Sequence, residues 1–402
     1  MRRMLAAVAL VTCSIVSYAQ DPAPAAPDPT ATARAAYASF RVARERADAE
    51  KDAAKKEKLD KAASAAFEKF CAEFDKVDWY EWKLSVDADL VAYGVHHGSV
   101  RAFEAEDFER ARKGWEFLAD ELPAHQLTGF ATSRYLPLVY AATGALDEGA
   151  ARLRKLVPKL SATNGAGALM GAGDLLSVAA DFDGARKAYD DARAALARAG
   201  KDEALSSLVK MQLESRTHVG EHVRDFTGAD AATGREFRLS SAAGKPALCL
   251  TMALFGRPDG WAFRTIAAVQ KKCASNGPVV VAITTFDLLS PLTKAAAEVE
   301  AKLPRNPDDK DGEKVKVTRE TFRKFADTYR LRMRATFPFV VAADGSLEGH
   351  ADYVRSHVLV LDAEQRIVLS AGQMDQDALQ WIGRAVCARW AAARPAAPPA
   401  GK

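Results

Sequence analysis

The pattern of apolar residues changes near Arg216, and this change constrains the fold more than any other feature of the chain. Residues 32–216 are dominated by Ala, Leu, Glu, Lys and Arg, and Gly and Pro are confined to expected helix ends. These are helix-forming residues, and their apolar members recur with a helical period. Beyond Arg216, short apolar runs alternate with amphipathic stretches. The sequence therefore predicts a helical segment followed by an α/β segment, with the boundary at about His218.

The α/β segment contains apolar runs of strand type, separated mostly by stretches of helix type. The expected strands are 248–255, 279–286, 337–342, 357–362 and 367–371. The expected helices are 261–275, 291–302, 318–330 and 376–389. Such alternation favours a sheet covered by helices on both faces. The charged stretch 305–317 is expected to be an exposed insertion.

The helical segment is expected to begin with one long solvated helix and to continue as helical hairpins. The first helix would carry the aromatic residues between Tyr37 and Phe74, with a highly charged middle at residues 44–58. Further along, one pattern recurs three times: Asp107-Phe108, Ala111, Trp115; Ala145-Leu146, Gly149, Leu153; Asp181-Phe182, Ala185, Tyr189. A small residue followed four positions later by a bulky one lets two helices approach closely, and the pattern is weakly similar to tetratricopeptide-type repeats. Such an array either packs only on itself or presents a concave surface to a partner protein.

The two ends of the chain have compositions that do not predict a packed core. Arg2 and Arg3 precede an apolar run at 5–16 and a small-x-small site ending at Ala19, which is the anatomy of a secretory signal. We expect cleavage after Ala19 and a periplasmic or secreted protein with no membrane span. Lipidation at Cys13 is the weaker alternative, because Cys13 lies inside the apolar run. Residues 20–33 are a Pro/Ala-rich linker, and 393–402 form a similar tail expected to be disordered.

Charge and cysteine content exclude several function classes. The chain has 56 Lys and Arg against 53 Asp and Glu, a net charge of +3. This is not the excess of positive charge that is typical of nucleic-acid-binding proteins. Its 5 cysteines form no C-x-x-C motif and no paired zinc spacing. We therefore expect no nucleic-acid partner, no metal and no cofactor.

Short motifs are spaced along most of the second segment. They are Val219-Gly220, Asp225-Phe226-Thr227, Gly234, Leu239-Ser240, Gly244-Lys245-Pro246, Phe337-Pro338-Phe339, Asp344-Gly345, Tyr353-Val354, Leu359-Val360-Leu361-Asp362 and Gly372. In order and spacing they resemble the redoxin families, the TlpA-like thiol oxidoreductases and AhpC/TSA peroxiredoxins of the thioredoxin superfamily. The resemblance covers residues 219–388. It implies an α + α/β chain in which a helical-hairpin array, 34–217, precedes a thioredoxin-like central sheet flanked by helices, 218–392.

The resemblance places the family's chemistry at the turn after the first core strand, where a C-x-x-C motif opens a helix and supplies a reactive thiolate. Here that turn is Gly256-Arg257-Pro258-Asp259, which keeps the proline but has no cysteine. Ser356 stands where the family has a cis-proline before the strand at 357–362. The resemblance thus implies thiol–disulfide exchange or peroxide reduction, while the residues of the turn argue against both.

Cysteines elsewhere in the chain differ in their expected burial and in their expected reactivity as nucleophiles. Cys249 lies in an apolar strand, and Cys71 and Cys387 are expected to be packing residues. Cys273 follows two lysines at a helix end and is the candidate thiol outside the motif. A structural disulfide, for example between Cys249 and Cys273, stays open, because exported proteins can form such bonds.

Two functions remain open, and whether the protein is an enzyme stays undecided. In the first, the domain has lost its redox chemistry and holds a protein or peptide on the helical array or at the former active-site face, through Arg257, Trp261, Arg355, Ser356 and His357. Free N–H groups at the helix start would then bind a carboxylate or peptide backbone; alternatively, Asp259 merely caps that helix. In the second, an off-motif cysteine such as Cys273 supports oxidoreductase or peroxidase activity.

Overall fold

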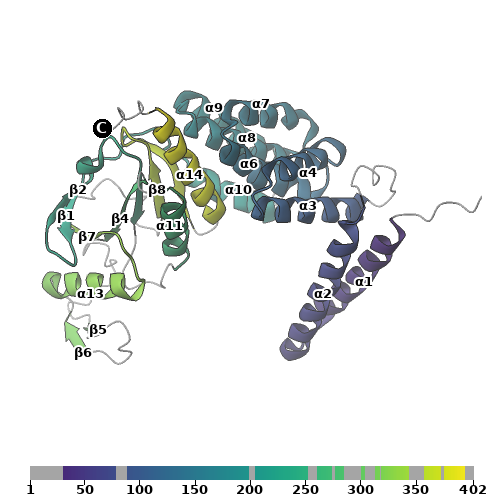
Figure 1. Cartoon of the computed structure of the whole chain (residues 1–402), viewed down its shortest axis with the longest axis horizontal. Coiled ribbons are helices and arrows are strands. Elements are labelled where there is room, and N and C mark those ends of the chain that lie inside the picture. The colour runs from purple at the N-terminus through teal and green to yellow at the C-terminus, as the bar shows by residue number, and fades with distance from the viewer. Residues whose placement is uncertain are drawn as a thin grey trace, which may run out of the picture. The chain divides into compact units, whose positions relative to one another are not determined.

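The computed structural model describes residues 30–77, 88–198, 204–251, 260–273, 277–284, 300–303, 313–316, 318–343, 357–372 and 375–393. The chain forms two compact units, Met1–Leu84 and Ser85–Lys402, shown in Figure 1. The expected signal sequence with Cys13, the expected linker up to residue 29 and the end of the expected tail lie outside the described residues. Within the described part of the chain, no helix combines the length and the apolar character needed to cross a membrane.

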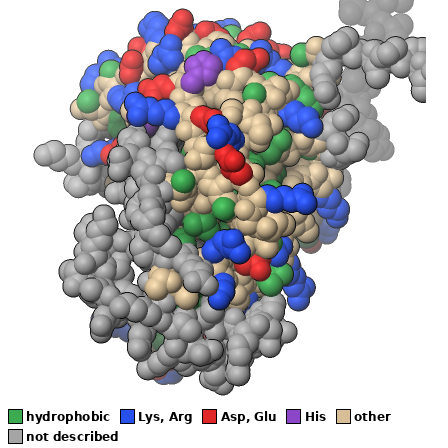
Figure 2. Space-filling model, turned by 90° about the vertical axis from the view of Figure 1, so that its left-hand side faces the viewer, with side chains coloured by type: hydrophobic (Ala, Val, Ile, Leu, Met, Phe, Trp, Pro, Cys, Tyr) green, Lys and Arg blue, Asp and Glu red, His purple; other side chains and the backbone are tan. Residues whose placement is uncertain are grey.

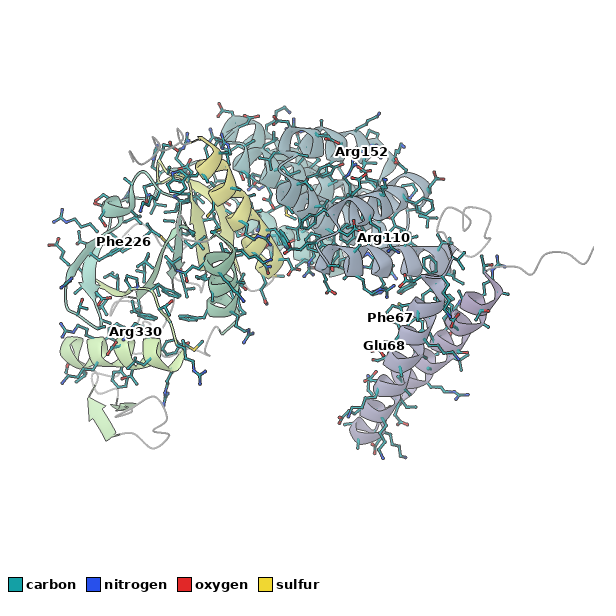
Figure 3. The ribbon with its side chains drawn as sticks, in the orientation of Figure 1. Phe67, Glu68, Arg110, Arg152, Phe226 and Arg330 are labelled. Carbon is teal, nitrogen blue, oxygen red and sulfur yellow. The ribbon has the colours of Figure 1, made fainter. Side chains whose placement is uncertain are left out.

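The first unit contains a hairpin of two helices, α1 (Ala31–Ala49) and α2 (Ala53–Phe74). The single long helix expected across residues 44–58 is wrong, because the chain turns at residues 50–52. Asp52 is the reason: its side chain accepts a hydrogen bond from the backbone N–H of Lys55 and starts a new helix there. Aromatic rings hold the two helices together, with the centroids of Phe40 and Phe67 4.9 Å apart (Figure 3).

The second unit begins with packed helices. They are α3 (Ala88–Glu104), α4 (Phe108–Glu121), α5 (Gln126–Phe130), a π-helical turn (Ala131–Tyr135), α6 (Leu136–Thr143), α7 (Leu146–Leu156), a 3₁₀ turn (Val157–Lys159), α8 (Ala162–Val178), α9 (Phe182–Ala197) and α10 (Ala204–Ser215). Helix α8 is buried along nearly its whole length and packs against α7 and α9. The expected helical hairpins are present, since α3 packs on α4, α6 on α7 and α8 on α9.

The recurring sequence pattern marks the first turns of α4, α7 and α9. Asp107 and Asp181 cap α4 and α9, because their side chains accept hydrogen bonds from backbone N–H groups three residues ahead. The small residue of each repeat sits where another helix comes close. At Gly149, for example, an added Cβ would lie 2.4 Å from the ring of Tyr140. The bulky residues Trp115, Leu153 and Tyr189 are almost completely buried.

The α/β segment is built on a mixed sheet of seven strands in the order β2-β1-β7-β4-β3-β8-β9. The strands are β1 (Thr227–Asp230), β2 (Glu236–Arg238), β3 (Ala247–Thr251), β4 (Val279–Thr284), β7 (Phe339–Ala342), β8 (His357–Leu361) and β9 (Ile367–Ala371). The strands β3, β4 and β7 run parallel, whereas β8 pairs antiparallel with β3, and β9 with β8. All five residues of β3 are buried, which explains their continuous apolar sequence.

Three long helices flank this sheet: α11 (Gly260–Cys273), α13 (Arg319–Arg332) and α14 (Gln376–Ala393). A 3₁₀ turn at Leu239–Ala242 precedes β3. The ring of Phe263 in α11 lies 6.1 Å from that of Tyr329 in α13 and 6.4 Å from that of Phe339 in β7. The helices α11 and α13 therefore lie on the same face of the sheet, and α14 packs against α11, β8 and β9. The α + α/β fold class with a thioredoxin-like central sheet is thus confirmed.

One expectation for the middle of the α/β segment is wrong in part. Of the predicted helix 291–302, the described residues belong to a strand, β5 (Glu300–Leu303). It pairs antiparallel with β6 (Glu313–Lys316), which lies in the predicted insertion 305–317, and the two strands form a small separate sheet. Pairing between strands supplies backbone hydrogen bonds that the local sequence pattern does not report, which is why the periodicity of this stretch predicted a helix.

The helical and α/β segments meet within one compact unit. The hydroxyl of Ser177 in α8 donates to the carbonyl oxygen of Val368 in β9 at 2.9 Å, and Arg389 in α14 donates to that of Val178 at 2.7 Å. Figure 2 shows acidic and basic side chains interspersed over the described part of one face, in keeping with the small net charge. Whether residues 218–392 also fold alone stays a prediction.

Candidate functional site

The site that the resemblance predicts would lie where β3 ends and β8 begins. Thr251, the last residue of β3, is the register partner of His357, the first residue of β8. The segments 252–259 and 351–356 therefore connect to β3 and β8 at the same end of these two strands. Most residues predicted for this site lie outside the described part of the chain: Gly256, Arg257, Pro258, Asp259, Arg355 and Ser356. For His357 the structure describes the backbone alone.

Trp261 is the predicted site residue whose side chain is described. It stands in the first turn of α11, and the hydroxyl of Thr265 donates to its carbonyl oxygen at 2.9 Å. Its side chain is 5% exposed, so it belongs to the packed interior of the domain. Trp261 therefore packs in the interior and supports the start of α11.

Cys249 cannot replace the missing thiols of the turn. It lies in the middle of β3 with 1% of its surface exposed. Burial in apolar surroundings raises the pKa of its thiol to about 12, because the charged thiolate would lose its hydration. The prediction that Cys249 is a small buried hydrophobe is confirmed, and Cys71, 4% exposed in α2, is likewise buried.

The described cysteines that do meet are Cys273 and Cys387. Cys273 is the last residue of α11 and is partly exposed, whereas Cys387 lies on α14 and is 5% exposed. A hydrogen bond from the Cys387 thiol, and then the nearby charge of Arg384, lower the pKa of Cys273 below its usual value despite burial. The same hydrogen bond and burial raise the pKa of Cys387.

This contact identifies a residue that the sequence had assigned to packing alone. Cys387 is buried, as expected, but it also brings a second thiol to the candidate Cys273. Cys249 and Cys273 are free thiols, so the structure contains no disulfide between them. No local sequence signal indicated the contact, because the two residues are far apart in the sequence.

A cleft of about 590 Å³ opens beside the two thiols. Its walls come from the end of α6, the start of α7, the end of α11 and one side of α14. Small residues such as Ala141, Gly144 and Ala388 line much of it, together with Trp381. The cleft thus joins the helical and α/β segments of the second unit, and both Cys273 and Cys387 face it.

Two cations of this cleft share one acidic partner. Lys272 Nζ lies 2.7 Å from Oε1 of Glu106, and Arg384 Nη1 lies 3.7 Å from the same oxygen. These contacts hold the pKa of Glu106 below its usual range, chiefly through the hydrogen bond from Lys272. The guanidinium of Arg384 also lies over the ring of Trp381, 4.0 Å from its centroid. The local charge beside the thiols is therefore positive.

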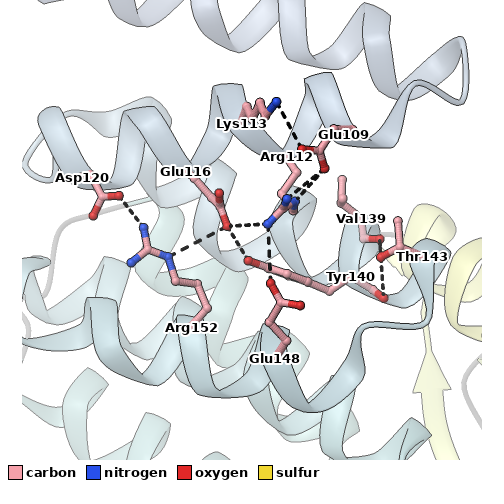
Figure 4. A network of polar contacts seen from close by, with 10 residues as sticks. All are labelled: Glu109, Arg112, Lys113, Glu116, Asp120, Val139, Tyr140, Thr143, Glu148 and Arg152. Atoms are coloured by element: carbon pink, nitrogen blue, oxygen red, sulfur yellow. Dashed lines mark hydrogen bonds and ion pairs between the residues drawn. The ribbon is translucent and has the colours of Figure 1, made fainter.

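A second polar cluster lies between α4, α6 and α7 and is shown in Figure 4. Arg112 contacts Glu109 at 2.8 Å, Glu148 at 3.5 Å and Glu116 at 3.6 Å. Glu116 accepts a hydrogen bond of 2.5 Å from the hydroxyl of Tyr140, and burial together with this bond raises the pKa of that phenol. Because these charges satisfy one another, the cluster fits the expectation that the helices pack on themselves better than that of a ligand site.

The described residues were also surveyed for metal ligands. No group of three or more His, Cys, Asp or Glu side chains within them is arranged to hold a metal ion. His125 instead contacts Asp89, with Nε2 and Oδ1 3.0 Å apart, and its other ring nitrogen accepts a hydrogen bond from the backbone N–H of Leu127. This histidine acts as a helix cap for α5.

No protein-family model matches the chain, and no curated protein matches it in sequence. Among solved structures, the chain is similar to the thioredoxin domain of a thiol-disulfide oxidoreductase from Bacteroides vulgatus, with 14% identity and a TM-score of 0.26 over 40% of this chain and 92% of that one. A thiol:disulfide interchange protein from a Bacteroides species gives 14% identity and a TM-score of 0.27, over 42% and 90% of the two chains.

The copper-bound ScoI protein of Bradyrhizobium japonicum is also similar, with 12% identity and a TM-score of 0.26. The match covers 42% of this chain and 97% of ScoI. All three TM-scores lie below 0.5. The fold assignment stands on the strand order and the helix packing described above.

Proposed function

We propose that this protein is an exported, thioredoxin-like binding protein that performs no thiol chemistry at the turn between β3 and α11 and holds a protein or peptide there. The observation that carries the proposal is the absence of cysteine from residues 250–272, together with the burial of Cys249. The thiol next to the turn, Cys249, has a pKa of about 12 and supplies no thiolate at neutral pH.

The backbone around this edge of the sheet supports a binding role. Because Thr251 pairs with His357, the chain segments that carry Arg257 and Arg355 connect to β3 and β8 at the same end of these strands. An α-helix that starts there has unpaired backbone N–H groups in its first turn, which attract a carboxylate or a peptide carbonyl. Two cations next to those groups would favour an anionic end of a peptide.

Binding is tested with the carboxymethylated B chain of insulin as the probe, since this peptide has no free thiol and a free C-terminal carboxylate. Fluorescence anisotropy would compare the wild-type protein with an Arg257→Ala, Arg355→Ala double variant. We expect the double variant to bind at least tenfold more weakly. An Arg330→Ala variant, which removes a partly exposed arginine that pairs with Asp327 in α13, is the matched control and should bind as the wild type does.

Equal binding by the wild type and the double variant would overturn the turn as the site. In that case the helical array, the other surface expected to hold a partner, becomes the location to examine. The exported state is tested separately, by determining the N-terminus of the protein after expression with its first 19 residues intact. We expect the mature chain to begin at Gln20, and a chain that keeps residues 1–19 would contradict cleavage.

A further inference from the structure

The two facing thiols of the second unit lie away from the turn between β3 and α11. Cys273 ends α11, whereas the turn precedes the first residue of that helix, Gly260. A helix of 14 residues at about 1.5 Å per residue therefore separates the two places by roughly 20 Å. Any chemistry of Cys273 and Cys387 is thus independent of the residues that occupy the turn.

The two thiols differ in their access to solvent. Cys273 is partly exposed and lines the cleft. Cys387 is 5% exposed and lies on the adjacent helix. An accessible thiol with a covered neighbour is the arrangement that thiol–disulfide exchange needs, because the first attacks an external disulfide and the second then displaces the product.

The charges around the pair favour a thiolate on the accessible sulfur. A hydrogen bond from the Cys387 thiol lowers the pKa of the Cys273 thiol, and the nearby charge of Arg384 acts in the same direction. Glu106 compensates part of the positive charge of Arg384 and Lys272, since it contacts both. The position of Cys273 at the end of α11 acts in the opposite direction, because a helix C-terminus disfavours an anion.

We propose that Cys273 and Cys387 are a thiol–disulfide exchange pair that reacts with small disulfides entering this cleft. The Cys273 thiolate attacks one sulfur of the disulfide, its S–S bond breaks, and one thiolate leaves. Cys387 then loses its proton and attacks the Cys273 sulfur, which releases the second thiolate and forms a Cys273–Cys387 bond. Two protein thiols are oxidised, and one disulfide is reduced to two thiols.

The architecture allows this bond to form with small movements. Helices α11 and α14 already pack against each other, and Cys273 is the last residue of its helix. The backbone carbonyl groups of a last helical turn lack partners within the helix, so the terminal residue adjusts more easily than one in the interior. The bond would fasten α11 to α14 beside the wall of the cleft that α6 provides.

The experiment uses the full chain, reduced and then incubated with oxidised glutathione at pH 7.5, and alkylated at successive times. Mass spectrometry of the tryptic digest reads the result directly, because Cys273 and Cys387 fall in separate peptides, 273–294 and 385–389. We expect the wild type to accumulate these two peptides joined by a disulfide. Cys387→Ser should instead accumulate glutathione on Cys273, at a level at least tenfold above that of the wild type.

In Cys273→Ser, neither a protein disulfide nor a glutathione adduct should form at Cys387 at a rate comparable to that of the products in the other proteins. Cys249→Ser is the matched control and should behave as the wild type does. Circular dichroism of each variant establishes that it is folded. The proposal is overturned if the wild type yields no 273–387 disulfide, or if glutathione stays on Cys273 equally in the wild type and in Cys387→Ser. Because peptide binding at the turn is measured with a thiol-free probe, the two proposals succeed or fail separately.

Discussion

Arg216 is held by two carboxylates across the junction of the helical and α/β segments. Its Nη1 lies 3.1 Å from Oδ1 of Asp375, and its Nη2 lies 3.3 Å from Oδ2 of Asp174. The Arg216 side chain is 1% exposed, and those of Asp174 and Asp375 are 7% and 4% exposed. Tyr189 also donates to Asp174, and Gln212 to Asp375, so the buried charges form one hydrogen-bonded group.

Replacing Arg216 should therefore destabilise the second unit strongly. Arg216→Met would leave two carboxylates buried without their counter-ion, and breaking a buried pair in this way costs about 3–5 kcal/mol of unfolding free energy. Urea denaturation followed by circular dichroism measures the loss. Lys187→Met is the control, since Lys187 makes an exposed ion pair with Asp191 that is worth about 0–1 kcal/mol. Equal losses in the two variants would show that the buried group contributes nothing specific.

Close helix packing at the recurring small residues predicts a second effect. Gly149→Ala would place a Cβ 2.4 Å from the Tyr140 ring, and such overpacking costs about 1–3 kcal/mol. Gly165→Ala is a matched control because it also occupies the fourth position of its helix, but its nearest neighbour would be Val157 Cγ1 at 3.5 Å. There the better helix propensity of alanine should stabilise by up to ~1 kcal/mol. The same sign of change in both variants would contradict this packing argument.

These examples show what the sequence could predict and what it could not. The recurring small and bulky residues predicted closely packed helical hairpins, and α4, α7 and α9 begin at these repeats. The contact between Cys273 and Cys387 joins residues more than a hundred positions apart, and neither residue's neighbourhood reports it. The strands β5 and β6 were missed for a related reason, since each depends on its partner strand for its hydrogen bonds.

Two histidines of α3, buried His96 and half-buried His97, should make the protein less stable in mild acid. Burial, aided by His97 and Arg134, lowers the pKa of His96 to about 3, and burial lowers that of His97 to about 4. An unfolded chain would protonate both near pH 6.5, so it binds more protons than the folded chain between that pH and these values. Stability is therefore complete above about pH 6.5 and falls as the pH is lowered toward 4.

The measurement is the free energy of unfolding in urea at pH 7, 6, 5 and 4.5. A single buried histidine contributes a slope of at most about 1.4 kcal/mol per pH unit. His96→Gln should flatten the profile by a large part of that slope, because glutamine does not titrate. Parallel profiles for the wild type and the variant would mean that acid destabilises the protein through other groups.

The excised segment 219–392 tests whether the α/β part is a domain in its own right. It contains all seven strands of the central sheet and the three helices α11, α13 and α14, so we expect a single cooperative unfolding transition. Its stability should be lower than that of the full chain. Trp381, for example, would lose its contacts with the rings of Phe103 and Phe108, now 4.8 and 5.2 Å away.

Asp375→Asn tests whether Asp375 stabilises the protein through its contact with Arg216 in the helical segment or within the excised segment 219–392 alone. In the full chain it weakens the contacts of Asp375 with buried Arg216 and with Gln212, although Asp174 still balances the charge of Arg216, and should cost about 1–3 kcal/mol. In the excised segment Arg216 is absent and water reaches Asp375, so the same change should alter stability by about 0.5 kcal/mol or less. Thermal melts of the four proteins give both differences. If the excised segment is unfolded while the full chain folds, the helical segment is part of the same core, and a helical surface free to bind a partner loses its support.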